Sequence, residues 1–127
     1  MRAKLIGMCA VLFAVSAFCY FSLQAVESTV SQVEALRVEL DGAARAGELE
    51  QARNLMRQIR DGWEARRPIL EILTTHDDLR VVSEQIIQAQ SSLNNLEMDG
   101  FFDASALLGE ALSHILRQER PSWPNLL

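Results

Sequence analysis

The chain has 127 residues, which is enough for one domain with a single modest core, and its formal charge at neutral pH is −5. Residues 24–127 contain all 17 acidic residues and 10 of the 12 basic ones, so this part of the chain has a formal charge of −7. Such an acidic surface repels phosphates, which disfavours binding to nucleic acids or anionic lipid headgroups through a basic patch.

The first expected element is a membrane span. Residues 5–23 contain no charged side chain, and as a helix they would be about 28 Å long, close to the roughly 30 Å hydrocarbon core of a bilayer. Arg2 and Lys4 lie in a basic start at 1–4, whereas acidic residues follow the span, so the positive-inside rule places the N-terminus in the cytoplasm. We therefore expect a single-pass anchor in the cell membrane and an extracytoplasmic domain at 24–120.

A cleaved signal peptide is the alternative interpretation, because it also begins with basic residues and an apolar run. Residues 15–17 offer small side chains for cleavage, but cleavage there would leave an apolar new terminus. At the second possible site, residues 23–25, the bulky Leu23 stands where a small residue is needed. The sequence therefore favours an uncleaved anchor.

Beyond the anchor, apolar residues recur at three- and four-residue steps, which is the period of one helix face. The first stripe starts at Val26 and ends before Gly47, and no breaker separates it from the anchor. A second stripe at 49–73 contains Pro68, which we expect to bend or restart the helix because proline lacks the backbone donor. The apolar positions of the two stripes are Val26, Val33, Leu36, Leu40, Ala43, Leu49, Ala52, Met56, Ile59, Trp63, Leu70 and Leu73.

A third helix is expected after capping residues at 74–78 and a fourth at about 103–118, with the turn between them at 99–100. Their apolar positions are Leu79, Val82, Ile86, Ala89, Leu93 and Leu96, then Ala104, Leu108, Ala111, Leu112 and Ile115. Aligning Gly47 with Gly100 gives a weak internal repeat, in which each glycine joins two antiparallel helices. The sequence thus predicts an all-α fold: an N-terminal transmembrane helix, then an extracytoplasmic bundle of about four helices built from two helical hairpins.

The segment 95–100 is similar to the opening of a calcium-binding loop, with Asp103 at the ninth position. The twelfth position of such a loop needs a bidentate carboxylate, and Ala106 cannot supply one. Both cysteines, Cys9 and Cys19, lie within the anchor, and the two histidines lack the spacing of a zinc site. We expect no metal and no cofactor.

His76, beside Asp77 and Asp78, is the best candidate for proton transfer. At the start of a helix, however, the same residues serve as caps, and no phosphate-binding glycine loop or nucleophile elbow accompanies them. His114 is expected to pack at the edge of the bundle. The expectation is that the protein is not an enzyme.

A tail at 121–127 follows the last helix, and Pro121 and Pro124 flank its tryptophan. An aromatic ring and two leucines in such a tail either fold back onto the bundle, which we favour, or dock into another protein. The candidate partner-binding residues are Trp123, Leu126, Leu127 and His76.

The order of these features resembles a family of small single-anchor membrane proteins of unknown function from Gram-positive, mostly spore-forming bacteria. The likeness extends over the whole chain. The shared features are the basic start, the span, Trp63, the helix start at 76–79, and a terminus with Glu119, Ser122 and Asn125. Arg80, where the family commonly has an acidic residue, and the proline-flanked tryptophan of the tail depart from its pattern. The resemblance implies a single-anchor helical protein and brings no activity, cofactor or substrate.

The leading hypothesis is an interaction module that binds another envelope protein through a groove between the hairpins or through the tail. The alternative is a self-associating spacer or scaffold, a homo-oligomer driven by the stripe of Val26, Val33 and Leu40. A third hypothesis is a sensor or enzyme that uses His76 with its two acidic neighbours.

Overall fold

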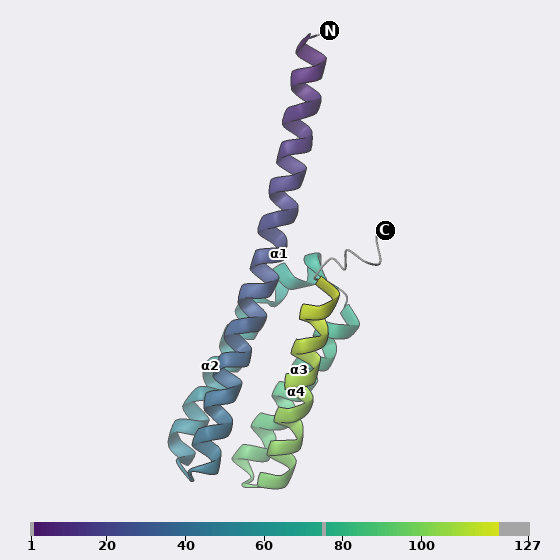
Figure 1. The fold of residues 1–127 in the computed structure, drawn as a ribbon. Coiled ribbons are helices and arrows are strands. Elements are labelled where there is room, and N and C mark those ends of the chain that lie inside the picture. Colours follow the sequence, from purple (N-terminus) through teal and green to yellow (C-terminus); the bar gives the residue numbers. More distant parts are fainter. Residues whose placement is uncertain (1, 75, 120–127) are drawn as a thin grey trace.

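The computed structural model describes residues 2–74 and 76–119, which form four α-helices (Figure 1). The helices are α1 (Arg2–Arg45), α2 (Leu49–Leu73), α3 (His76–Asn94) and α4 (Met98–Glu119). The N-terminal half of α1 projects from the bundle as a rod, and its C-terminal half packs with the other three helices.

The bundle consists of two antiparallel helical hairpins. α1 packs against α2, α3 packs against α4, and the hairpins meet where α1 lies beside α4 and where α2 lies beside α3. Within the described ranges, no Cα of α1 lies within 8 Å of a Cα of α3, and the same holds for α2 and α4, so these helices are diagonal to each other. Each helix therefore packs on two neighbours around one core, as in an up-and-down four-helix bundle. This arrangement confirms the predicted bundle of two helical hairpins.

The predicted apolar stripes form the core. Its larger buried side chains are Val26, Val30, Val33, Leu40, Leu55, Met56, Ile59, Trp63, Leu70, Leu79, Val82, Ile86, Leu93, Phe101, Leu108, Leu112 and Ile115. Val26, Val33 and Leu40 belong to this set, so the stripe that the scaffold hypothesis assigns to self-association is already covered by the protein's own helices. Self-association would have to use another surface.

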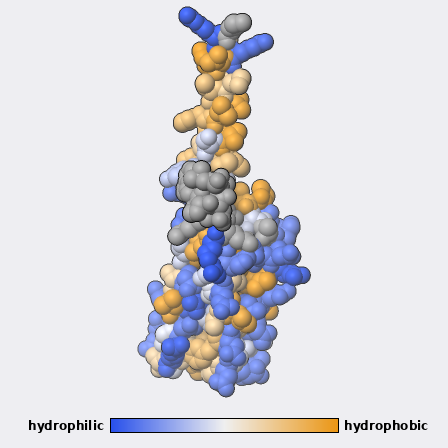
Figure 2. Space-filling view, turned by 45° about the vertical axis from the view of Figure 1, so that its right-hand side comes forward, coloured by the Kyte–Doolittle hydropathy of each residue, from blue (hydrophilic) through white to orange (hydrophobic). Residues whose placement is uncertain are grey.

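α1 continues from the expected anchor into the bundle as one uninterrupted helix. Its first buried residue is Val26, and the apolar segment before it has no buried residue. Figure 2 shows this segment as an apolar rod that stands clear of a mostly hydrophilic bundle. The helix is long and apolar enough to cross a membrane.

Pro68 lies inside α2, so of the two predicted outcomes, a bend or a restart of the helix, the restart does not occur. The proline removes the hydrogen bond that its nitrogen would donate to the carbonyl of Glu64. Both residues are exposed, and the freed carbonyl can bind water instead. The helix therefore continues past the proline, with Trp63 before it and Leu70 after it buried in the same core.

The two hairpin turns have the same backbone hydrogen bonds. In each turn, two successive N–H groups bond back to carbonyls near the end of the preceding helix, at 3.2 and 2.9 Å after α1 and at 3.2 and 2.8 Å after α3. This is the pattern of a Schellman motif, in which one residue adopts a left-handed conformation. That residue is Gly47 in the first turn, with φ 78°, and Leu96 in the second, with φ 59°.

The second turn corrects two predictions. First, α4 begins at Met98 and not near residue 103, so Gly100 lies inside the helix and not in the turn. Second, Leu96 lies in the turn and is 56% exposed, so it is not a core position of α3. The structural repeat therefore aligns Gly47 with Leu96 and not with Gly100. The sequence was misleading because a leucine occupies the left-handed position that glycine usually fills.

Candidate interaction surfaces

A polar cluster joins α1 to α4. The Arg37 guanidinium donates to the carboxylate of Glu34 at 2.6 and 2.8 Å and to Asp41 at 3.2 Å. Its Nη1 also lies 3.4 Å from both the hydroxyl and the carbonyl oxygen of Ser105, and that hydroxyl donates to Asp41 at 2.6 Å. A Cβ at Gly109 would lie 2.8 Å from Arg37 Cζ, so the absence of a side chain there makes room for the guanidinium.

The charge of Arg37 is balanced within this cluster. Its hydrogen bond with Glu34 raises the pKa of Arg37, and the negative charges of Glu34 and Asp41 raise it further, whereas partial burial lowers it. The side chain is only 16% exposed. Because two carboxylates and a serine already use its donors, Arg37 serves to clamp the two hairpins together and is poorly placed to bind an external anion.

The other seam between the hairpins, where α2 meets α3, is also bridged. The indole N–H of Trp63 donates to the hydroxyl of Ser83 at 2.9 Å, and both side chains are buried. Arg60 donates to Gln90 at 3.2 Å on the surface above them. The predicted core position of Trp63 is confirmed. A partner that enters the predicted groove between the hairpins would have to displace such contacts.

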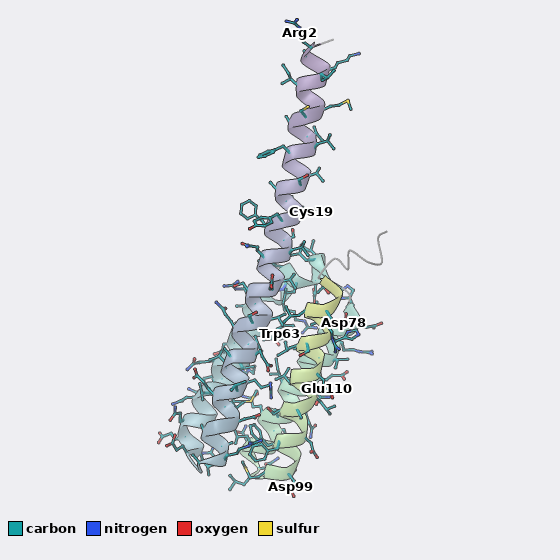
Figure 3. All side chains as sticks on the ribbon, viewed as in Figure 1. Arg2, Cys19, Trp63, Asp78, Asp99 and Glu110 are labelled. Atoms are coloured by element: carbon teal, nitrogen blue, oxygen red, sulfur yellow. The ribbon has the colours of Figure 1, made fainter. Side chains whose placement is uncertain are left out.

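His76 is the first residue of α3 and is exposed, as is Asp77. The carboxylate of Asp78 lies 3.4 Å from Nδ1 of His114 and thereby links α3 to α4. His114 is 52% exposed, as expected for a residue at the edge of the bundle. Figure 3 shows Asp78 towards the end of the bundle from which the rod projects and Asp99 at the opposite end.

Residues 2–74 and 76–119 contain no group of three or more His, Cys, Asp or Glu side chains that could hold a metal ion. In the segment similar to a calcium loop, only residues 95–97 are non-helical, and Asp99 and Asp103 both lie in α4. A calcium loop presents its ligands from an irregular backbone, so the calcium-loop interpretation does not fit. Cys9 and Cys19 are exposed on the rod.

Three of the four predicted partner-binding residues, Trp123, Leu126 and Leu127, lie outside the described residues. The fourth, His76, is the first residue of α3 and follows closely on Leu73, which contacts the same hollow as Phe18 and Phe21 of the rod.

An apolar hollow of about 270 Å³ lies where the rod joins the bundle, and we call it the junction hollow. Phe18 and Phe21 of α1 line one side, and Ile69, Ile72 and Leu73 of α2 line the other. The sequence analysis did not identify this surface. The sequence feature that could have indicated it is the pair Ile69 and Ile72, which lie three residues apart in α2 but outside the stripe that forms the core.

Comparisons of the chain with models of protein families, with curated proteins and with solved structures find no match. The resemblance to a family of small single-anchor membrane proteins therefore stays a prediction. The fold defines a four-helix bundle on a long apolar N-terminal helix, and its function has to be argued from its surfaces.

Proposed function

We propose that the protein is a membrane-tethered, extracytoplasmic interaction module of the cell envelope. The observation that supports this proposal is the apolar half of α1, which has no buried residue yet is continuous with a bundle that has its own buried core. Nineteen uncharged residues cannot remain in water at this exposure without a large unfavourable free energy, whereas a bilayer removes that cost. The bundle then presents its polar surface at a fixed position beside the membrane.

The proposed orientation has the N-terminus in the cytoplasm, because Arg2 and Lys4 precede the apolar segment and acidic residues follow it. Fusions after Leu127 test it: alkaline phosphatase, which is active only outside the cytoplasm, is expected to be active there, and a reporter active only in the cytoplasm is expected to be silent. The opposite result contradicts the orientation. The mass of the mature protein shows whether the first residues are retained.

A partner in the same membrane would meet the end of the bundle nearest the bilayer. His76 is exposed at this end, and the tail with Trp123 follows the helix α4 that returns to it. We therefore propose that an envelope membrane protein binds there. A photocrosslinking amino acid at His76 is expected to capture this protein in intact cells, whereas the same group at Asn95, in the turn at the far end, is the matched control.

Deleting residues 121–127 tests the role of the tail. We expect the shortened chain to keep its helix content and its denaturation midpoint while the crosslink from His76 is lost, because the described residues already form one core of buried apolar side chains from all four helices. The measurements are circular dichroism in mild detergent and crosslinking in cells. An unfolded product would show that the tail is structural, and an unchanged crosslink would show that it does not contact the partner.

A further inference from the structure

The end of the bundle next to the rod exposes apolar side chains that do not belong to the core. Ile72 is 81% exposed and Ile69 is 53% exposed, and with Leu73 they form the α2 side of the junction hollow. Figure 2 shows apolar surface at this edge of the bundle, close to the rod. A single exposed isoleucine is ordinary, but Ile69 and Ile72 lie one helix turn apart and share a hollow with the apolar residues of the rod. Such an apolar group marks a surface that is covered by something other than the protein's own core.

Helix geometry fixes the depth of this surface relative to the anchor. Measured from Leu5, a hydrocarbon layer of roughly 30 Å extends about 20 residues along a helix and ends near Ala25. Phe21 lies within that layer, and Ile72 shares the junction hollow with it. Because α1 is unbroken between Phe21 and Val26, the anchor cannot enter a bilayer without bringing the end of α2 to the bilayer surface.

The chemistry of the junction hollow fits lipid acyl chains. Of its described lining residues, only Ser22 has a polar side chain. The exposed Arg66 and the half-exposed Arg67, which pairs with Glu71 at 3.1 Å, precede Ile69 and Ile72 in α2. At a membrane surface, arginine stems cover apolar area while their guanidinium groups stay in the headgroup layer.

We propose that the end of α2 is a second membrane contact, in which Ile69 and Ile72 insert into the leaflet from which α1 emerges. The occupant of the junction hollow is then bilayer lipid. This inference depends on the proposed function, since α1 must first be in the membrane. The bundle is held at two points, and these set its tilt against the bilayer.

The test uses the full chain with Cys9→Ala and Cys19→Ala in vesicles of phosphatidylcholine, a lipid without net charge. An environment-sensitive fluorophore is attached at Ile72→Cys, at Ile87→Cys or at Phe13→Cys, and a nitroxide on the lipid acyl chain is the quencher. Ile87 is the matched control, because it is also an isoleucine, is 63% exposed, and lies about 16 Å along α3 from its first residue. Phe13 reports on the anchor.

We expect strong quenching at position 13 and quenching at position 72 that is at least roughly twofold that at position 87, because only groups near the hydrocarbon meet the nitroxide. Quenching at 13 without quenching at 72 overturns the second contact and leaves the anchor intact. No quenching at 13 overturns the anchor itself.

Two further outcomes would also overturn the contact. If position 72 is quenched only after residues 121–127 are deleted, the tail of the chain occupies the junction hollow. If it is quenched only after dilution to monomer, a second copy of the chain occupies it.

Discussion

Two buried serines of α3, Ser83 and Ser92, differ in whether their hydroxyl group has a hydrogen-bond partner. The hydroxyl of Ser83 accepts the indole N–H of Trp63, whereas the hydroxyl of Ser92 is buried and has no hydrogen-bond partner among the described residues. A buried polar group that lacks a partner loses its hydration without compensation. The same substitution at these two positions therefore has opposite expected effects.

Ser83→Ala is expected to lower the free energy of unfolding by about 1–3 kcal/mol, because it leaves the Trp63 donor buried and unpaired. Ser92→Ala is expected to be neutral or to raise the free energy of unfolding by about 1 kcal/mol. Denaturant unfolding of the full chain in mild detergent measures both. If both substitutions lower the free energy of unfolding equally, the hydroxyl of Ser92 has a hydrogen-bond partner that stabilises the fold as much as the Trp63 bond does.

Leu96 keeps a left-handed backbone conformation at a cost of about 1 kcal/mol or more for a residue with a Cβ. Leu96→Gly removes that strain and little buried area, so we expect the free energy of unfolding to rise by about 0.5–1 kcal/mol. Gly47→Ala is the mirror-image control in the first turn, and we expect it to be destabilising because its φ is also positive. Thermal unfolding by circular dichroism checks both, and a loss on Leu96→Gly contradicts the assigned turn.

At the scale of elements, the hairpins are held together by contacts between residues that are distant in sequence. Arg37 and Ser105 are separated by 68 positions, and Trp63 and Ser83 by 20. Because the pKa of Arg37 is raised in the fold, its contribution to stability is present at neutral pH and, as the pH rises, is lost only in strongly alkaline solution. At neutral pH the charge of this arginine makes no pH-dependent contribution to stability.

Gly109→Ala measures how tightly the hairpins are clamped. In an Arg37→Ala background, the added methyl group no longer meets the guanidinium, and the free energy of unfolding is expected to rise by about 0.8–1 kcal/mol from helix propensity. In the natural chain the methyl group displaces the guanidinium, so the gain is expected to shrink or reverse. A double-mutant cycle by denaturant unfolding gives the coupling, about 0.5 kcal/mol or more. If the effects of the two substitutions on the free energy of unfolding are additive, the Arg37 side chain can move away from position 109 at no cost.

The helices and their core faces could be predicted from the sequence, because a period of three to four residues reports directly on burial. Gly47 was recognised as a turn since glycine has no Cβ, but Leu96 was not, because nothing in a leucine indicates a left-handed backbone. The contact of Arg37 with Ser105 and that of Asp78 with His114 could not be predicted, since each joins residues of two helices that are distant in sequence. The predicted tail residues stay untested, and Ile72 was missed because it lies off the core stripe.

At the scale of the whole molecule, the proposed anchoring by the apolar rod can be tested by placing a charge in it. Phe13→Arg places a charge near the middle of the proposed span, where its insertion costs about 3 kcal/mol. We expect this variant to move substantially from the membrane fraction to the soluble or degraded fraction. Ile87→Arg, a change of the same kind on the bundle surface, is the control. Unchanged membrane retention of Phe13→Arg contradicts the anchor.

The unbroken course of α1 also has a mechanical consequence. From Gln24 to Arg45 the helix rises by about 32 Å without a glycine pair or proline to bend it. The helix therefore couples its exposed apolar half rigidly to the bundle: a rotation or tilt of that half turns the far end of the bundle by the same angle. The distance along the helix from Gln24 to the far turns stays fixed, because α1 has no point at which to bend.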